Sequence, residues 1–182
     1  MRAVVTGLSA LALAACGGSD VPSPAERLSQ SESGAVAEII DPGKVLLRSE
    51  GLVAGPDAFF FAAGQNEVEA ALTRALEVPG EVMDMPECGA GPMQSSSYPG
   101  GLTVNYRDGI LVGWFVDETS ENVEVEGLAV GVTAADVEAI SGFARIEGST
   151  LGDEFMLGGA MAGFIEDGAV SMIYSGTQCF FR

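Results

Sequence analysis

Two Asp-Gly pairs, each set between apolar stretches, constrain the fold of this chain more than any other feature. Asp108-Gly109 and Asp167-Gly168 are pairs that favour two-residue β-hairpin turns. Before the first pair, Leu102, Val104 and Tyr106 alternate with polar residues, as in a strand that buries one face. The sequence therefore predicts two antiparallel hairpins, with Arg107 paired to Ile110 across the first turn.

A helix is predicted ahead of each hairpin. The first begins near Asn66, which with Glu69 resembles a capping box, and it ends at Pro79-Gly80. Its apolar residues recur on one helical face, namely Val68, Leu72, Ala75 and Leu76. The second helix is short and begins after Thr133, which is predicted to be its N-cap.

Helix and hairpin recur in the same order, which predicts two diverged copies of one unit. The expected fold class is α+β, with two tandem helix plus antiparallel β-hairpin repeats that form a helix-on-sheet domain. The expected organisation is a lipoprotein signal peptide over 1–15, a flexible tether over 16–34, a first repeat with N-terminal strands over 35–126, and a second repeat over 127–182.

The N-terminus has the layout of a secretory signal. Met1-Arg2 is positive, 3–13 is a short apolar run, and small residues precede Cys16. This cysteine resembles the lipobox of bacterial lipoproteins, which implies that Cys16 is lipidated and tethers the chain to a membrane. Gly17 rather than Asp after the cysteine implies the outer membrane, facing the periplasm. The alternative is a plain signal peptide with an incidental cysteine.

Charge and cysteine content limit the partners and the compartment. The chain has 8 Lys and Arg against 26 Asp and Glu, a formal net charge of −18. Such a chain repels nucleic acid and anionic head groups, so no nucleic-acid partner is expected. In an oxidising compartment, Cys88 and Cys179 are predicted to form a disulfide that closes a loop of about 90 residues.

Catalytic signatures are few. The chain has no histidine, which removes Ser-His-Asp and Cys-His systems and the common zinc sites, so no cofactor or metal and no enzyme activity are expected. Two carboxylate pairs, Asp153-Glu154 and Asp84 with Glu87, are the remaining option for acid–base chemistry. The acidic stretch 117–126 is predicted to be a solvated connector, since its spacing is not that of an EF-hand.

The predicted outer face of the two hairpins is unusually apolar for a half-buried sheet. It is expected to carry Ile110, Val112, Trp114, Phe164 and Ile173. One hypothesis is that this face binds a protein partner, because exposed aromatic patches are typical of interfaces. The other is that the N-terminal segment or a loop covers it and that these residues belong to the core.

The segment Gly131-Val132-Thr133 with Asp136-Val137 resembles the BamE/SmpA-like lipoproteins and the beta-lactamase-inhibitor-like repeat domains. The resemblance implies a helical segment laid against a small antiparallel sheet, and a non-catalytic envelope protein that acts through protein–protein contact. We therefore expect a membrane-anchored, periplasm-facing binding or scaffolding protein with an envelope protein partner. The alternatives are an inhibitor of an envelope or secreted enzyme, and a small carboxylate-dependent hydrolase.

Overall fold

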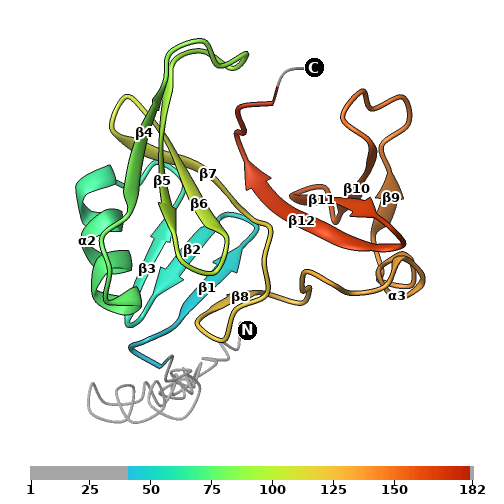
Figure 1. The fold of residues 1–182 in the computed structure, drawn as a ribbon, viewed down its shortest axis with the longest axis horizontal. Coiled ribbons are helices and arrows are strands. Elements are labelled where there is room, and N and C mark those ends of the chain that lie inside the picture. Colours follow the sequence, from blue (N-terminus) through green and yellow to red (C-terminus); the bar gives the residue numbers. More distant parts are fainter. Residues whose placement is uncertain (1–40, 181–182) are drawn as a thin grey trace, which may run out of the picture. The chain divides into compact units, whose positions relative to one another are not determined.

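Strands dominate the part of the chain that the computed structural model describes, residues 41–180 (Figure 1). It contains two helices and twelve strands, arranged in one sheet of four strands and one of eight. The predicted α+β class of helix-plus-hairpin repeats is therefore wrong. The physical reason is that stretches without apolar alternation, such as 81–100, also pair as strands.

The four-stranded sheet has the order β3-β2-β1-β8. Its strands are β1 (Val45–Arg48), β2 (Gly51–Ala54), β3 (Asp57–Phe60) and β8 (Val123–Val125). β8 runs parallel to β1, and Glu124 on β8 forms an ion pair with Lys44. Part of the acidic stretch 117–126 is thus a paired strand rather than a solvated connector.

The eight-stranded sheet has the order β4-β5-β6-β7-β12-β11-β10-β9, which is symmetric about its centre. Its first half contains β4 (Glu81–Met85), β5 (Met93–Tyr98), β6 (Leu102–Arg107) and β7 (Ile110–Val116). Its second half contains β9 (Phe143–Arg145), β10 (Asp153–Leu157), β11 (Met161–Glu166) and β12 (Ala169–Gly176). The halves join where β7 and β12 pair antiparallel, with Phe115 opposite Tyr174.

Both Asp-Gly turns form as predicted. Asp108 and Gly109 have φ angles of 52° and 75°, and Asp167 and Gly168 have 51° and 81°. Two successive positive φ values define the type I′ turn, whose twist matches that of the flanking strands. The predicted pairing of Arg107 with Ile110 is confirmed.

Three residues beyond each turn, the strand register shifts by one residue. Val112 is the extra residue on β7, and Ser171 is the extra residue on β12. Because side chains alternate with period two, a one-residue bulge moves every later side chain to the other face. Trp114 and Ile173 therefore point to the opposite face from the one predicted.

The main core lies against one face of the eight-stranded sheet, here called the inner face. It contains Leu102, Val104, Trp114 and Ile173, together with residues of the four-stranded sheet such as Leu47. The helix α2 (Gln65–Leu76) packs here and buries its apolar residues Val68, Ala71, Leu72 and Ala75, which confirms the predicted face.

The predicted cap of α2 is wrong. The N-cap is Gly64, which offers no side chain, and Asn66 lies inside the first turn. The carboxylate of Glu69 does not return to the helix N-terminus. It accepts hydrogen bonds from Gln65 Nε2 at 3.0 Å and from Ser96 Oγ at 2.6 Å, and so links α2 to β5.

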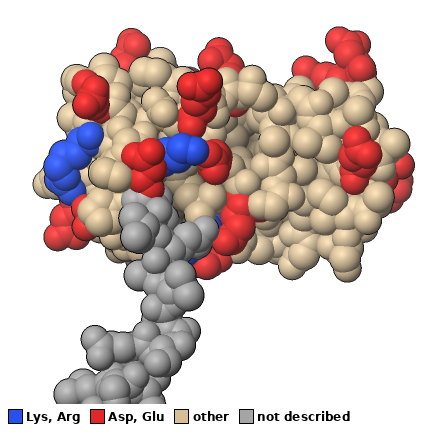
Figure 2. Space-filling model, turned by 90° about the horizontal axis from the view of Figure 1, so that it is seen from below, with Lys and Arg blue, Asp and Glu red and all other residues tan. Residues whose placement is uncertain are grey.

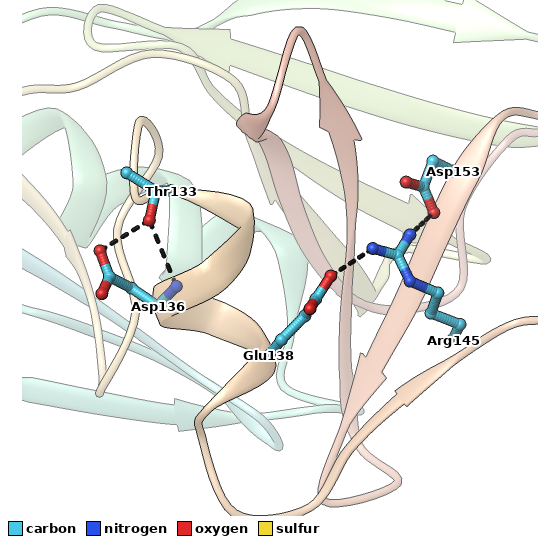
Figure 3. A network of polar contacts seen from close by, with 5 residues as sticks. All are labelled: Thr133, Asp136, Glu138, Arg145 and Asp153. Atoms are coloured by element: carbon cyan, nitrogen blue, oxygen red, sulfur yellow. Dashed lines mark hydrogen bonds and ion pairs between the residues drawn. The ribbon is translucent and has the colours of Figure 1, made fainter.

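The helix α3 (Ala134–Glu138) is capped as predicted (Figure 3). The Thr133 hydroxyl oxygen accepts from the Asp136 backbone N–H at 3.2 Å, and the hydroxyl donates to the Asp136 carboxylate at 2.7 Å. At the other end of the network, Arg145 on β9 forms ion pairs with Glu138 and Asp153. These contacts hold the short helix against the edge of the sheet.

Thr133→Ala is expected to lower the free energy of unfolding by about 1 kcal/mol, because it removes the only side-chain acceptor at the α3 N-terminus. Thr133→Ser keeps the hydroxyl and should retain most of that stability. Chemical denaturation of the two variants beside the parent checks this. Equal stability of the alanine and serine variants would contradict a capping role.

Candidate binding face

The five residues predicted to form a partner site do not lie together. Trp114 and Ile173 are fully buried in the core, and the Trp114 indole Nε1 donates to the Arg48 carbonyl at 2.9 Å. Val112 is half-buried, and its carbonyl accepts from the Thr177 backbone N–H. For Trp114 and Ile173 the core hypothesis is thus correct, since both belong to the main core on the inner face, and Trp114 is bonded there to β1 of the four-stranded sheet.

A different aromatic cluster lies on the opposite face of the eight-stranded sheet, here called the outer face. It consists of Phe164, Tyr174 and Phe180, with Phe115 and Met172 packed against it. The Phe180 ring meets the Tyr174 ring edge-on at a centroid distance of 5.2 Å and the Phe164 ring at 5.7 Å. Of the predicted site residues, only Phe164 belongs to this cluster.

A carboxylate is buried beside the aromatic cluster. Glu154 on β10 is 1% exposed, and its two oxygens accept from the Tyr174 hydroxyl and from Ser149 Oγ, the latter at 2.6 Å. A buried carboxylate requires such donors, because desolvation of its charge is otherwise unfavourable. Glu154 therefore fixes the orientation of the Tyr174 ring at the centre of the outer face.

The chain after β12 turns back over the outer face of the first half. Thr177 N–H donates to the Val112 carbonyl at 2.8 Å, and the Gln178 side chain accepts from Asn105 Nδ2 at 2.8 Å. Gly113 is required beneath this crossing, because a Cβ there would lie 2.4 Å from the Thr177 carbonyl oxygen. Residues 177–180, here called the tail, thus fill the bulge on β7 and deliver Phe180 to the aromatic cluster.

Cys179 in the tail lies beside Cys88, in the connection between β4 and β5. Both are free thiols in the structure, and Cys88 Sγ contacts Met93 Sδ at 3.4 Å. Burial, and then a hydrogen bond with Cys88, raises the pKa of the Cys179 thiol to about 11. The predicted disulfide stays a prediction, and the fold places its two partners in contact.

A cleft of about 640 Å³ opens on the outer face of the second half. Its apolar walls are Phe164, Met172 and Phe180, and its acidic residues are Asp117 and Glu166. No Lys or Arg is among the described residues that line it. The volume is within the range of sites that bury a small ligand or a few residues of a peptide.

The two carboxylate pairs named from the sequence are not brought together. Asp84 is on β4 and Glu154 on β10, six positions apart in the strand order, or roughly 30 Å at 4.8 Å per strand. Asp153 is engaged with Arg145. Within residues 41–180, no group of three or more Cys, Asp or Glu side chains is placed to hold a metal ion.

The surface of the described chain is strongly acidic. Figure 2 shows carboxylates spread over one side of the molecule, with the few basic side chains among them. Four of the basic residues in the described range form ion pairs with neighbouring carboxylates: Lys44, Arg48, Arg74 and Arg145. The resulting field attracts cationic partners and repels anionic ones.

The predicted lipidation site, Cys16, lies outside the described residues, as do the leader and the tether. Neither helix in the range 41–180 has the length and apolar character needed to cross a membrane. No protein-family model matches the chain, and comparisons with curated proteins and with solved structures found no match. The resemblance to envelope lipoproteins therefore stays a prediction from sequence.

Proposed function

We propose that this chain is a lipid-anchored lipoprotein of the cell envelope that acts as a non-catalytic binding protein, with its outer face turned toward a protein partner in the periplasm. Cys16 is the proposed attachment point for the lipid. The observation that carries the binding role is the outer-face cluster of Phe115, Phe164, Tyr174 and Phe180 beside an acidic cleft.

Two features of the described residues support binding rather than catalysis. The inner face of the same sheet packs into the main core with α2 and the four-stranded sheet, whereas the outer face carries an aromatic cluster in which the rings of Phe115 and Phe180 are partly exposed. Of the candidate carboxylates, Asp153 is paired with Arg145, and Glu154 is buried and hydrogen-bonded. Both groups of this pair are engaged in structural contacts, which favours a structural role for them over acid–base chemistry.

The test is site-specific photo-crosslinking in cells, with the full chain carrying a benzophenone amino acid at Met156. Met156 is 38% exposed and lies on the outer face, opposite Ala162. Phe60, which is 65% exposed on β3 of the other sheet, is the matched control position. We expect one discrete adduct from position 156 and none from position 60.

The anchoring part of the proposal has its own readout in the same cells. Cys16→Ser should abolish incorporation of labelled palmitate and release the chain from the membrane fraction, because the thiol is the only proposed site of acylation. Absence of an adduct at 156 with labelled, folded protein would overturn the binding role. Palmitate labelling that persists in Cys16→Ser would overturn the anchor.

A further inference from the structure

The symmetry of the eight-stranded sheet reveals an unfilled position in its second half. Val112 and Ser171 are the equivalent bulge residues of the two halves. Equivalent backbone hydrogen bonds surround both: Leu111 N–H donates to Ala63 O and Val170 N–H to Val132 O, each at 2.8 Å. Val112 makes a third backbone bond, because its carbonyl accepts from the Thr177 N–H of the tail.

The equivalent of that third bond is missing within residues 41–180. The symmetry of the sheet exchanges β7 and β12 and makes Phe115 equivalent to Tyr174. Three residues further along the chain, Glu118 is therefore equivalent to Thr177. Glu118 makes no backbone bond to Ser171, because β7 ends at Val116 and the chain continues to β8 in the other sheet. No segment of the described chain therefore plays the part of the tail in the second half.

The cleft occupies the place where such a segment would lie. Phe164 corresponds to Asn105, to which the tail residue Gln178 is hydrogen-bonded in the first half, whereas Phe164 meets only the edge of the Phe180 ring and lines the cleft. Met172 stands where the first half has Gly113, and its flexible side chain forms one wall. The site thus offers an apolar floor, next to a bulged strand, at a position that its counterpart fills with extended backbone.

The charge of the cleft decides which segment fits. Asp117 at the end of β7 and Glu166 at the end of β11 line it, the described residues around it contribute no cation, and the chain as a whole carries −18. A second copy of this chain would bring the same negative charge and be repelled. A segment with Lys or Arg on either side of an apolar residue fits both features, because the apolar residue can pack on the floor of the cleft while the cations lie beside Asp117 and Glu166.

We infer that the cleft binds an extended segment of a basic partner protein, with an apolar side chain on Phe164 and Phe180 and flanking Lys or Arg side chains at Asp117 and Glu166. In the second half of the sheet, this segment occupies the position that the tail occupies in the first half. This inference rests on the proposed binding function and names the chemistry of its partner.

The test uses the full acylated chain in micelles of a neutral detergent and fluorescent seven-residue peptides. One peptide alternates lysine with valine, the second alternates lysine with serine, and the third alternates glutamate with valine. We expect saturable binding, by fluorescence anisotropy, of the lysine–valine peptide only. The lysine–serine peptide has the same charge, so its equal binding would show general attraction to an acidic surface and overturn the inference.

Three variants that each remove one negative charge test whether the peptide binds in the cleft. Asp117→Asn and Glu166→Gln should each weaken binding of the lysine–valine peptide about two- to fivefold, the range of exposed charge pairs. Asp84→Asn on β4, far along the sheet, removes the same charge and should change it little. Equal losses in all three variants would overturn the inference. If the three variants lose peptide binding equally but the photo-crosslink from position 156 still forms, the proposed binding function stands and only the inference about the cleft fails.

Discussion

Trp114→Ala is expected to lower the free energy of unfolding by about 3–5 kcal/mol, the range for a fully buried large aromatic side chain. Trp114 is 0% exposed and packs in the core between the eight-stranded and four-stranded sheets. The substitution also leaves the Arg48 carbonyl without the indole donor at 2.9 Å. Chemical denaturation of the full chain measures the loss.

Two control variants separate burial from general sensitivity. Trp114→Phe keeps most of the volume and loses the hydrogen bond, so it should cost less than the alanine variant. Met156→Ala, on the outer face, should cost about 0.5 kcal/mol or less, as expected of an exposed side chain. A loss below about 1 kcal/mol in Trp114→Ala would place the indole on the surface and contradict the core described above.

Oxidation of Cys88 and Cys179 to a disulfide is expected to raise the free energy of unfolding by up to about 4–5 kcal/mol, since the bridge would close a loop of about 90 residues in the unfolded chain. It would also fix the tail, and with it Phe180, on the outer face. Unfolding of the oxidised and reduced chains, with bridge formation verified by mass after thiol blocking, checks this.

The pH dependence of this oxidation follows from the Cys179 thiol. Its pKa is raised from the ordinary value of 9.0 to about 11, so at neutral pH the group is protonated and a poor nucleophile. Thiol–disulfide exchange at Cys179 should therefore accelerate as the pH rises from about 9 to about 11. Cys88→Ser and Cys179→Ser should each show no effect of oxidant on stability. A redox-dependent stability that survives in either variant would contradict the bridge.

Local chemistry in the sequence was sufficient to predict several elements. The Asp-Gly turns, the buried stripe of α2 and the Thr133 cap depend on residues within a few positions of one another, and all three are confirmed. By contrast, β5 carries three consecutive serines and no apolar alternation, so its strand could not be recognised. Its pairing with β4 and β6 decides its conformation, since a backbone between two strands satisfies its hydrogen bonds there.

The candidate site shows the same division. The sequence marked Phe164 and both partners of the cysteine pair, but it placed Trp114 and Ile173 on the wrong face. The cause is one extra residue at Val112 and one at Ser171, each of which reverses the alternation after it. No residue type at these two positions distinguishes a bulge from a regular strand.

What the sequence by itself determined about this protein is its acidic charge, its hairpin turns and its short-range helical contacts, because these depend on residue types at fixed, small separations. Only the tertiary structure decided which face is covered, how β7 meets β12, and that the tail fills one bulge while a cleft occupies the other. Those outcomes depend on pairing between strands about sixty residues apart, where a shift of one residue exchanges the buried and exposed faces of a strand.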